Sequence, residues 1–169
     1  IEHPVALQIA GSDPKTLSQA AVIGEQYGYD EINLNIGCPS KRVQAGNFGA
    51  CLMADPKLVS ECVESIKEKV KIPVTIKCRI AIDDYNPDEM LTEFVETTKK
   101  TGVSTYIIHA RKAMLNGLDP KQNREIPELN YDRVYQLKND FPDLEIVING
   151  GISSIEDSIN HLKVLDGVM

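Results

Sequence analysis

The chain has 169 residues, of which 42% are hydrophobic and 25% charged, a composition typical of one globular domain. Its net charge of −7 argues against nucleic-acid binding through bulk positive charge, so any such contact must be local. No apolar run approaches the ~20 residues of a membrane helix, and the four cysteines form no C-x-x-C pair. We expect a soluble, cytoplasmic protein without a membrane segment, disulfide framework or metal; residence in an organelle is left open.

Short apolar runs alternate with longer amphipathic stretches along the chain. In chain order they predict a strand over 5–9, a helix over 14–27, a strand over 31–36, a helix over 56–70 and a strand over 73–79. A helix over 87–100, a strand over 105–109, a helix over 131–139, a strand over 144–149, a helix over 155–165 and a strand from Gly167 follow. The first three helices begin at a proline that follows an N-cap residue, namely Asp13, Asp55 or Asn86.

This alternation predicts a parallel sheet, because parallel neighbours need a crossover and a helix supplies it. A doubly wound nucleotide-binding sheet would normally carry a glycine-rich turn after its first strand, and here Gly11 stands alone. We therefore predict a parallel (β/α)8 TIM barrel. Because such a barrel usually needs roughly 250 residues, we expect residues 1–169 to be a partial catalytic domain of about five β/α units, excised from a longer enzyme.

A polar side chain stands at the carboxyl end of each of the first five predicted strands. With a period of two residues, these positions share one face of the sheet, opposite apolar residues such as Ile32 and Leu34. Functional side chains of a barrel lie at this end of its strands. We predict that the following residues form the rim of one site: Gln8, Asn35, Lys77, Arg79, His109 and Asn149.

Cys38 follows a predicted strand and stands between Gly37 and Pro39. A cysteine is by itself most often a small packing residue. Here the flanking residues predict a stiff loop that holds the thiol at the mouth of the site. The other three cysteines lack such a setting, and we predict that they are packing residues.

Lys77 occupies an inward position of its strand, where a cation needs a facing anion or acceptor. A buried structural ion pair is one interpretation, and an anionic planar cofactor bound with the help of Arg79, His109 and Asn149 is the other. A lone histidine is more often a core residue than a catalytic one. The pair Gly150 and Gly151 could admit a phosphate or sugar, although such a pair is also an ordinary turn.

The connection over 110–130 is about twice the usual length for such a loop, and loops of this length are usually functional or disordered. Runs of charge are usually just solvated surface. However, eight of the 18 basic residues fall on strand ends and loops of one face of the predicted fold. A locally basic rim on an acidic protein suits a phosphate-rich partner. The residues of this basic rim are Lys41, Arg42, Lys77, Arg79, Arg111, Lys112, Lys121 and Arg124.

Three segments resemble motifs of the tRNA-dihydrouridine synthases. Asn-Leu-Asn-Ile-Gly-Cys-Pro over 33–39 resembles the catalytic-cysteine motif of that family. Ile-Ile-His-Ala-Arg-Lys-Ala over 107–113 and Pro-Lys-Gln-Asn-Arg-Glu-Ile-Pro over 120–127 resemble its bacterial DusA branch. The resemblance extends from Pro4 to Met169. Two departures, Ala81 and Met114, concern the fit of the substrate.

The resemblance implies a barrel that holds FMN at its mouth, NADPH as reductant, tRNA as substrate, and a helical domain beyond the last strands. Carried over position by position, Cys38 matches the proton donor. Six residues match flavin-binding positions: Gln8, Lys77, His109, Asn149, Gly150 and Gly151. Five residues match positions that hold the target base and the tRNA: Asn35, Arg79, Arg111, Lys112 and Arg124.

The implied reaction reduces the C5–C6 bond of a D-loop uridine, around position 20 of tRNA, with a hydride from FMN and a proton from Cys38. One alternative is another FMN barrel, similar to dihydroorotate dehydrogenase, that acts on a free pyrimidine. Such an enzyme has no need of the basic loop over 110–130. A second alternative is a non-catalytic RNA-binding barrel, which the presence of Cys38, Lys77 and His109 argues against.

Overall fold

A computed structural model describes residues 2–169 and contains one parallel sheet of six strands. The strands are hydrogen-bonded in the order of the chain, so each one pairs with its sequence neighbour. Their bounds are β1 Ala6–Ile9, β2 Glu31–Ile36, β3 Val74–Arg79, β4 Thr105–His109, β5 Glu145–Asn149 and β6 Gly167–Val168.

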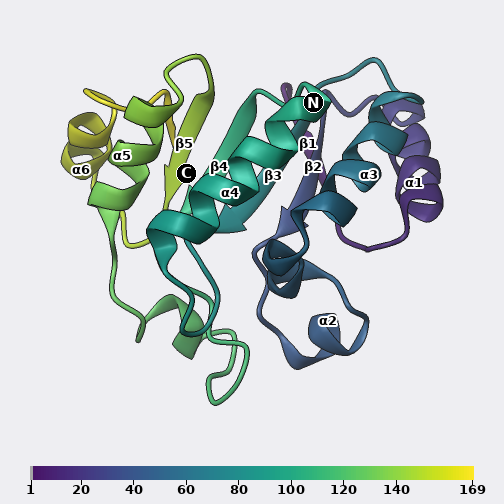
Figure 1. Cartoon of the computed structure of the whole chain (residues 1–169). Helices are drawn as coiled ribbons and strands as arrows, with labels where there is room; N and C mark the ends of the chain where they lie inside the picture. The colour runs from purple at the N-terminus through teal and green to yellow at the C-terminus, as the bar shows by residue number, and fades with distance from the viewer. Residues whose placement is uncertain (1) are drawn as a thin grey trace.

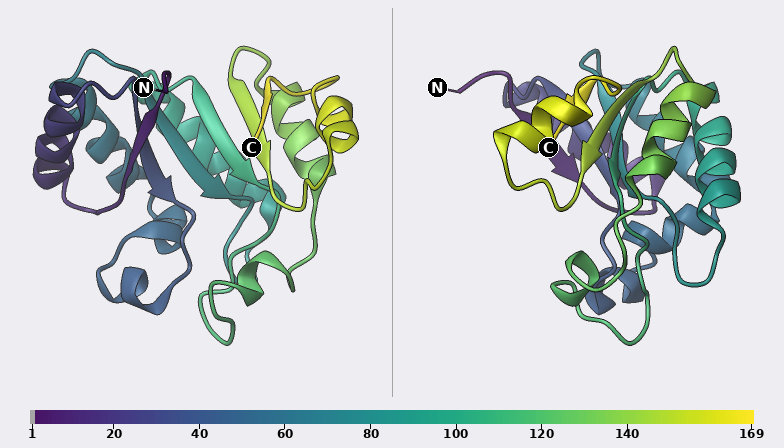
Figure 2. Two further views of the ribbon diagram at one scale, coloured as in Figure 1. Left: turned by 180° about the vertical axis from the view of Figure 1, so that it is seen from behind. Right: turned by 90° about the vertical axis from the view of Figure 1, so that its left-hand side faces the viewer.

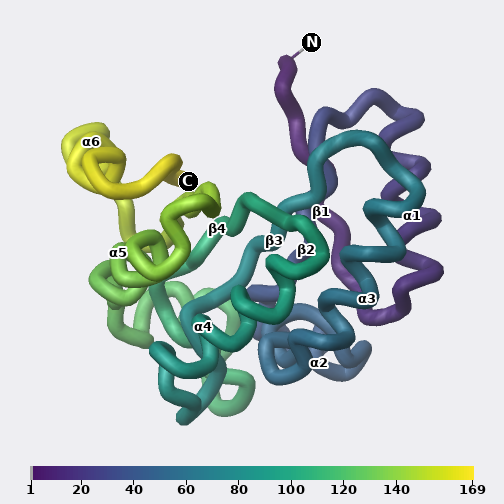
Figure 3. The backbone as a smooth tube through the Cα atoms, turned by 45° about the horizontal axis from the view of Figure 1, so that its top comes forward, coloured from purple at the N-terminus to yellow at the C-terminus, as the bar shows by residue number. Residues whose placement is uncertain are grey.

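One helix or more connects each strand to the next, and the helices cover one face of the sheet (Figures 1 and 2). The α-helices are α1 Pro14–Gln26, α2 Lys41–Ala45, α3 Pro56–Lys67, α4 Pro87–Thr98, α5 Tyr131–Asp140 and α6 Ile155–His161; the 3₁₀ helices are η1 Gly49–Ala54, η2 Lys99–Thr101 and η3 Gln122–Arg124. In Figure 3, α1 and α3 lie at the right of the view, beside β1 and β2, and α5 and α6 lie at the left, at the other end of the row of strands. Sequential strand order with helices on a single face is the arrangement of a partial (β/α)8 barrel, and the prediction of about five β/α units is confirmed.

The predicted helix starts are correct because the capping signals are local. The side chains of Asp13, Asp55 and Asn86 accept hydrogen bonds from backbone N–H groups in the first turns of α1, α3 and α4. The predicted end of α3 at residue 70 was too late, because the helix stops at Lys67. The predicted end at residue 100 falls in η2, which continues α4 until Gly102 ends it in the left-handed conformation. No periodic pattern predicted α2, η1 or η3, which are all short.

The two faces of the sheet differ in chemistry. Toward the helices, Ile32, Leu34, Ile36 and Ile76 are fully buried in the apolar core. The opposite face carries hydrogen-bonded polar side chains across neighbouring strands, as in the bond from Asn33 Nδ2 to Thr75 Oγ1 at 2.7 Å. The polar face is therefore the inner side of the partial barrel, and it leads to the carboxyl ends of the strands.

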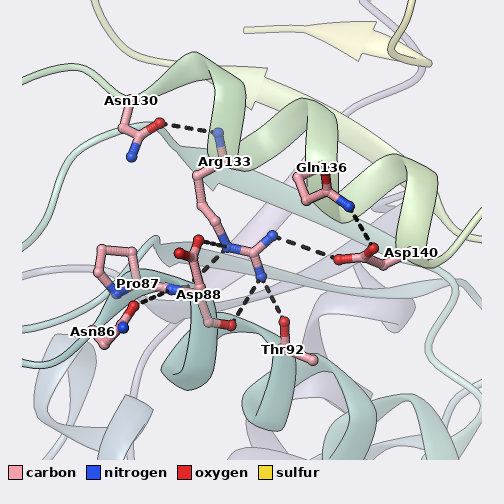
Figure 4. Close-up of polar contacts among 8 residues, drawn as sticks. All are labelled: Asn86, Pro87, Asp88, Thr92, Asn130, Arg133, Gln136 and Asp140. Atoms are coloured by element: carbon pink, nitrogen blue, oxygen red, sulfur yellow. Dashed lines mark hydrogen bonds and ion pairs between the residues drawn. The ribbon is translucent and has the colours of Figure 1, made fainter.

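Arg133 joins α5 to the start of α4 (Figure 4). Its side chain is 2% exposed and donates to the carbonyls of Pro87 and Asp88 and to Thr92 Oγ1. The carboxylate of Asp88 lies 3.3 Å from Nε, while that of Asp140 lies 3.8 Å from Nη1, beyond hydrogen-bond distance. The guanidinium therefore fixes two neighbouring helices mainly through backbone carbonyl groups.

Within residues 2–169, none of the helices has the length and apolar character needed to cross a lipid bilayer.

Candidate functional site

A cavity of about 210 Å³ opens at the carboxyl ends of β2 to β5. Its wall also includes the Cys38 turn (residues 35–40) and the β4–α5 loop (residues 110–130). These two segments lie at the same end of the molecule, below the sheet in Figure 1. The lining residues are Asn35, Gly37, Cys38, Pro39, Lys77, Cys78, Arg79, His109, Pro120, Arg124 and Asn149.

The strand register brings the predicted rim residues together. Asn35 pairs with Lys77, Arg79 with His109, and His109 with Asn149. Gln8 is exposed, pairs with Asn33 in the register, and accepts a hydrogen bond from Asn35 Nδ2 at 2.9 Å. The polar strand ends therefore form one continuous rim, as the period-two pattern indicated.

The Cys38 turn is fixed through its backbone. Asn35 Oδ1 accepts hydrogen bonds from the N–H groups of Gly37 and Cys38, at 3.0 and 3.1 Å. The carbonyl of Cys38 accepts one from the N–H of Ala50 at 2.9 Å. Gly49, which packs against this turn, has a left-handed backbone with φ +76°. A Cβ there would lie 2.6 Å from the Cys38 carbonyl oxygen. The stiffness of the turn thus depends on Gly49, a residue that the sequence did not point to, as well as on the neighbours of Cys38.

The four cysteines are all free, and their surroundings differ as predicted. Cys38 is partly exposed and lines the cavity. Cys62 and Cys78 are buried in the core, and burial raises the pKa of their thiols to about 11 and about 12. Cys51 is partly buried, its thiol donates to the Phe48 carbonyl, and burial raises its pKa. Cys38 is thus the thiol that opens onto the site.

Lys77 faces a neutral acceptor. Its Nζ donates to Asn149 Oδ1 at 3.0 Å and contacts Met169 Sδ at 3.1 Å. None of the ion pairs within residues 2–169 includes Lys77, so the interpretation as a buried ion pair fails for the part of the chain described. Burial lowers the pKa of Lys77 to about 8, and the positive charge of Arg79 acts in the same direction. A ligand with negative charge would relieve this penalty.

His109 is 9% exposed, and its Nδ1 is buried without a hydrogen-bond partner in the described structure. Burial lowers its pKa to about 3, with Arg79 and Lys77 adding to the effect, so the ring is neutral at pH 7. A Cβ on Gly150 would lie only 2.9 Å from Nε2 of this ring. A buried ring nitrogen with no partner is costly, and one beside an open cavity is suited to bind a ligand.

Gly150 and Gly151 both have left-handed backbone conformations, with φ of +108° and +70°. A Cβ on Gly151 would lie 2.4 Å from the Leu129 side chain, and the Tyr131 hydroxyl donates to the Gly150 carbonyl at 2.8 Å. The turn after β5 therefore requires glycine at both positions. Its predicted contact with a phosphate or sugar stays a prediction.

Two arginines predicted to hold tRNA are engaged within the protein. Arg79 is 5% exposed and donates to the carbonyls of Gly37, Lys112 and Asn123. Burial lowers its pKa to about 10, with a further contribution from the charge of Arg111. Arg111 donates to the Pro127 carbonyl, and its buried Nε has no partner within residues 2–169.

The remaining basic residues are more accessible. Lys112 is partly buried and its Nζ donates to the Asp83 carbonyl at 3.2 Å. Arg124 is exposed and lines the cavity. Lys121, in the same loop, and Lys41 and Arg42, directly after the Cys38 turn, are also exposed. Arg124 is therefore the predicted tRNA-binding arginine that a ligand can reach most directly.

Sequence reasoning missed two amides of this region. Asn123 is fully buried and both accepts from the Met114 N–H and donates to carbonyls of the β4–α5 loop. Gln44 donates to the carbonyls of Pro39 and Leu115, at 2.8 and 2.7 Å. Asn123 lies within the motif over 120–127, but the motif does not reveal that its side chain is buried and holds the loop. Gln44 has no periodic or motif signal, because its contact with Leu115 joins residues 71 apart.

Metal coordination finds no support in this region: residues 2–169 contain no group of three or more His, Cys, Asp or Glu side chains that could hold a metal ion.

The sequence of the chain matches the family model described as dihydrouridine synthase over residues 1–169. It is 60% identical to the tRNA-dihydrouridine(20/20a) synthase of Shewanella oneidensis, over 168 residues that cover 99% of this chain and 50% of that protein. It is 59% identical to the protein of the same name from Vibrio vulnificus, covering 99% of this chain and 52% of the other. The chain thus spans about half the length of the curated relatives it matches.

Two solved structures with low sequence identity are similar in fold. A phosphoenolpyruvate phosphomutase from Streptomyces platensis superposes with a TM-score of 0.60 at 13% identity, covering 99% of this chain and 59% of that one. A dipeptide epimerase from Enterococcus faecalis gives a TM-score of 0.60 at 11% identity, covering 97% of this chain and 37% of the other. At such low identity the likeness concerns the fold alone.

Proposed function

Since this chain belongs to the dihydrouridine synthase family, we propose that it forms part of the catalytic barrel of an FMN-dependent enzyme that reduces uridine in the D loop of tRNA. The observation that carries the proposal is one cavity at the strand ends, lined by the thiol of Cys38, the cation of Lys77 and the neutral ring of His109. The relatives bear the name tRNA-dihydrouridine(20/20a) synthase, which supports uridine 20 or 20a as the target.

The residues of the cavity fit a flavin. Lys77 has a neutral acceptor as its partner and a pKa lowered by burial, so a negatively charged ring edge is a better partner than the surroundings supply. His109 offers a ring nitrogen that has no partner within residues 2–169. The amide of Asn149 accepts from Lys77 and donates to the Met169 carbonyl, so it would exchange one of these contacts for the flavin. When bound, FMN would supply the hydride for C6 of uracil, with NADPH as the source of its electrons.

The turn after β5 and the first strand provide further contacts for the cofactor. Gly150 and Gly151 directly follow Asn149 of the cavity wall, and Gly150 packs against the His109 ring, which supports their assignment to the flavin. Gln8 is exposed on the same rim and joined to Asn35. The rest of the FMN site and the helical domain that grips tRNA would come from the half of the relatives' length that this chain does not match.

Cys38 is proposed as the acid of the reaction. Reduction of the C5–C6 bond adds a hydride at C6 and a proton at C5, and the base must leave the tRNA stack to reach the site. The thiol is the proton source: the S–H bond breaks, a C5–H bond forms, and the thiolate recovers a proton from solvent. A turn held through backbone hydrogen bonds keeps the sulfur in one place during this transfer.

The basic residues around the cavity are proposed to bind the tRNA backbone. Arg124 is exposed at the cavity wall, and Lys112 lies at the start of the same loop. Asn35, Arg79 and Arg111 already bind protein groups, so their proposed part is to shape the pocket for the flipped base.

The proposal is tested with the full-length enzyme, unmodified tRNA and NADPH, followed by mass spectrometry of the nucleosides. We expect purified enzyme to contain FMN and to form dihydrouridine at position 20 or 20a. A flavin-loaded enzyme that reduces dihydroorotate or free uracil derivatives and leaves tRNA unchanged would favour the pyrimidine-oxidoreductase alternative. A protein that binds tRNA without flavin or turnover would favour a non-catalytic RNA-binding barrel.

A further inference from the structure

The carbonyl groups on both sides of Cys38 are bound by side chains that also bind the β4–α5 loop. Before Cys38, the Gly37 carbonyl accepts from Arg79, whose Nη1 also donates to the carbonyls of Lys112 and Asn123. After Cys38, the Pro39 carbonyl accepts from Gln44 Nε2, which also donates to the Leu115 carbonyl. The Cys38 turn and the β4–α5 loop are thus joined twice.

Gln44 uses both N–H bonds of its carboxamide in this bridge. The NH2 group has two hydrogens, and it donates to the carbonyls of Pro39 and Leu115. Leu115 is 71 residues from Gln44 in the chain. The short helix α2 directs the side chain, and Ser40 Oγ caps it by accepting from the Val43 N–H. No other residue type of this length has two donors on one uncharged nitrogen.

The loop at the far end of the bridge is itself braced. The N–H of Leu115 donates to Asp83 Oδ1 at 2.7 Å, and the neighbouring Met114 is bound on both its N–H and its carbonyl by Asn123. The loop also contributes Pro120 and Arg124 to the wall of the cavity that Cys38 lines. A group that binds in the cavity therefore meets the loop and the thiol as parts of one connected unit.

We propose that Gln44 is a positioning residue for Cys38, which locks the Cys38 turn to the β4–α5 loop so that the thiol points into the cavity. The part of this inference that concerns catalysis rests on the proposed function; the part that concerns the thiol does not. Without the bridge, the turn keeps its bonds to Asn35, Ala50 and Arg79 but loses its tie beyond Pro39. The thiol then samples more orientations, including ones that face solvent.

Two substitutions in the full-length enzyme separate the bridge from other effects. Gln44→Met keeps the length and neutrality of the side chain and removes both donors. Gln44→Glu also removes the donors and adds a negative charge against two carbonyl oxygens. Gln19→Glu, on the exposed surface of α1, makes the same change of charge away from the site and serves as the matched control.

The first readout is the rate at which iodoacetamide alkylates Cys38, followed by mass spectrometry of its peptide across a range of pH. We expect Gln44→Met and Gln44→Glu to raise this rate about fivefold or more, which corresponds to the loss of one ordinary hydrogen bond, with melting temperatures close to that of the unmodified enzyme. Gln19→Glu should leave the rate unchanged. Equal alkylation rates in all four proteins would overturn the proposal, as would an effect of Gln44→Glu that Gln44→Met lacks.

The second readout divides the reaction in two. Reduction of bound flavin by NADPH should be unchanged in both Gln44 variants, because Gln44 contacts neither Lys77 nor Asn149. Reduction of tRNA should slow about tenfold through kcat, with little change in KM. A loss confined to KM would assign Gln44 to tRNA binding and overturn the positioning role. If the enzyme formed no dihydrouridine at all, the proposed function would fail while the alkylation rates still decided the role of Gln44.

Discussion

Cys38 differs from the other cysteines in what surrounds its sulfur. Cys38 is partly exposed and lines the cavity, whereas Cys78, also in the cavity wall, and Cys62 are buried in the core. If Cys38 gives the proton to C5, Cys38→Ala should leave folding, FMN content and flavin reduction by NADPH nearly intact, because none of these uses the thiol. Dihydrouridine formation should fall by about 10²–10⁴-fold, the usual effect of removing a positioned acid.

Cys62→Ala is the matched control for this prediction. It removes a buried thiol from α3 and should lower the free energy of unfolding by about 1–2 kcal/mol while leaving the rate of tRNA reduction unchanged. The two variants are compared by thermal melting and by nucleoside mass spectrometry. An unfolded Cys38→Ala protein, or one with full activity, would contradict the assignment of Cys38 as the acid.

The lowered pKa of Lys77 leads to a prediction about pH. The pKa is about 8 in the folded protein against an ordinary value of 10.5, so Lys77 loses its charge as the pH rises through about 8. Binding of an anionic flavin should therefore weaken above pH 8, as measured by titration of the apoenzyme with FMN. Lys77→Arg should move the decline to higher pH, and Lys77→Met should bind weakly at every pH without this inflection.

The lowered pKa of Lys77 also affects the free energy of unfolding, and this effect runs opposite to the effect on flavin binding. Between pH 8 and 10.5 the unfolded chain binds the proton on Lys77 that the folded chain has lost, so the contribution of this group to the free energy of unfolding rises with pH. Flavin affinity and the Lys77 contribution to stability should therefore change in opposite directions over this range. Parallel changes would mean that another group governs the binding of flavin.

The connection between β2 and α3 depends on one glycine. Gly49 begins η1 with φ +76°, and a Cβ there would meet Val43 at 2.3 Å and the Cys38 carbonyl oxygen at 2.6 Å. Gly49→Ala should lower the free energy of unfolding by about 1–3 kcal/mol and raise the alkylation rate of Cys38, because the turn must move. Chemical denaturation and alkylation measure the two effects.

Gly28→Ala supplies the comparison. Gly28 has a similar backbone, with φ +83°, but a Cβ there meets no atom within 4 Å. Gly28→Ala should lower the free energy of unfolding by about 1–2 kcal/mol through backbone strain alone. It should leave the alkylation rate of Cys38 unchanged. If both variants changed the reactivity of Cys38 equally, the close contact at Gly49 would not be the cause.

Helices α4 and α5 depend on Arg133 for their contact near the start of α4. Arg133→Met should lower the free energy of unfolding by about 1–3 kcal/mol, because the carbonyls of Pro87 and Asp88 and the hydroxyl of Thr92 lose their donor. Asp140→Asn should change stability by well under 1 kcal/mol, since that carboxylate is 37% exposed and 3.8 Å away. Urea denaturation of both variants tests the difference, and equal losses would show that the ion pairs dominate.

The parts of this fold that sequence could predict are those encoded locally. The N-caps Asp13, Asp55 and Asn86 mark helix starts within three residues of themselves, and the period-two pattern of β2 assigns its two faces. A helix of five residues such as α2 has no periodicity to detect. The hydrogen bond from Gln44 of this helix to the β4–α5 loop joins residues 71 apart, and no local pattern encodes such a contact.

The candidate site was predictable in position but not in all of its partners. Strand ends in a parallel sheet meet at one edge, so Asn35, Lys77 and His109 were expected together. Arg79 was expected at the site and lines the cavity, but its guanidinium also binds three backbone carbonyls of two loops, which was not expected. Those carbonyls become acceptors at this place only when the loops are folded, which explains why the sequence did not reveal them.

The protein has a net charge of −7, yet three basic residues, Lys77, Arg79 and Arg124, stand in the wall of the cavity. If Arg124 contacts a tRNA phosphate, Arg124→Gln should weaken tRNA binding. The slope of log affinity against log salt concentration should become shallower by about one, the amount expected for one lost phosphate contact. Fluorescence titrations of the full-length enzyme with tRNA at several salt concentrations measure the slope. Lys71→Gln, at an exposed position beyond the opposite end of β3, should leave the slope unchanged. Identical slopes for Arg124→Gln and the unmodified enzyme would remove Arg124 from the tRNA contact.

The sequential order of the strands also bears on how the chain folds during translation. Each ladder joins strands that follow one another, and Asn33 and Thr75 in the β2–β3 ladder are only 42 residues apart. Synthesis at about 5–20 residues per second gives each new strand seconds to settle on the edge of the previous one before the next emerges from the ribosome. We therefore expect this segment to assemble on the ribosome one β/α unit at a time, from β1 toward β6, with the loops of the cavity closing only after β5 has docked.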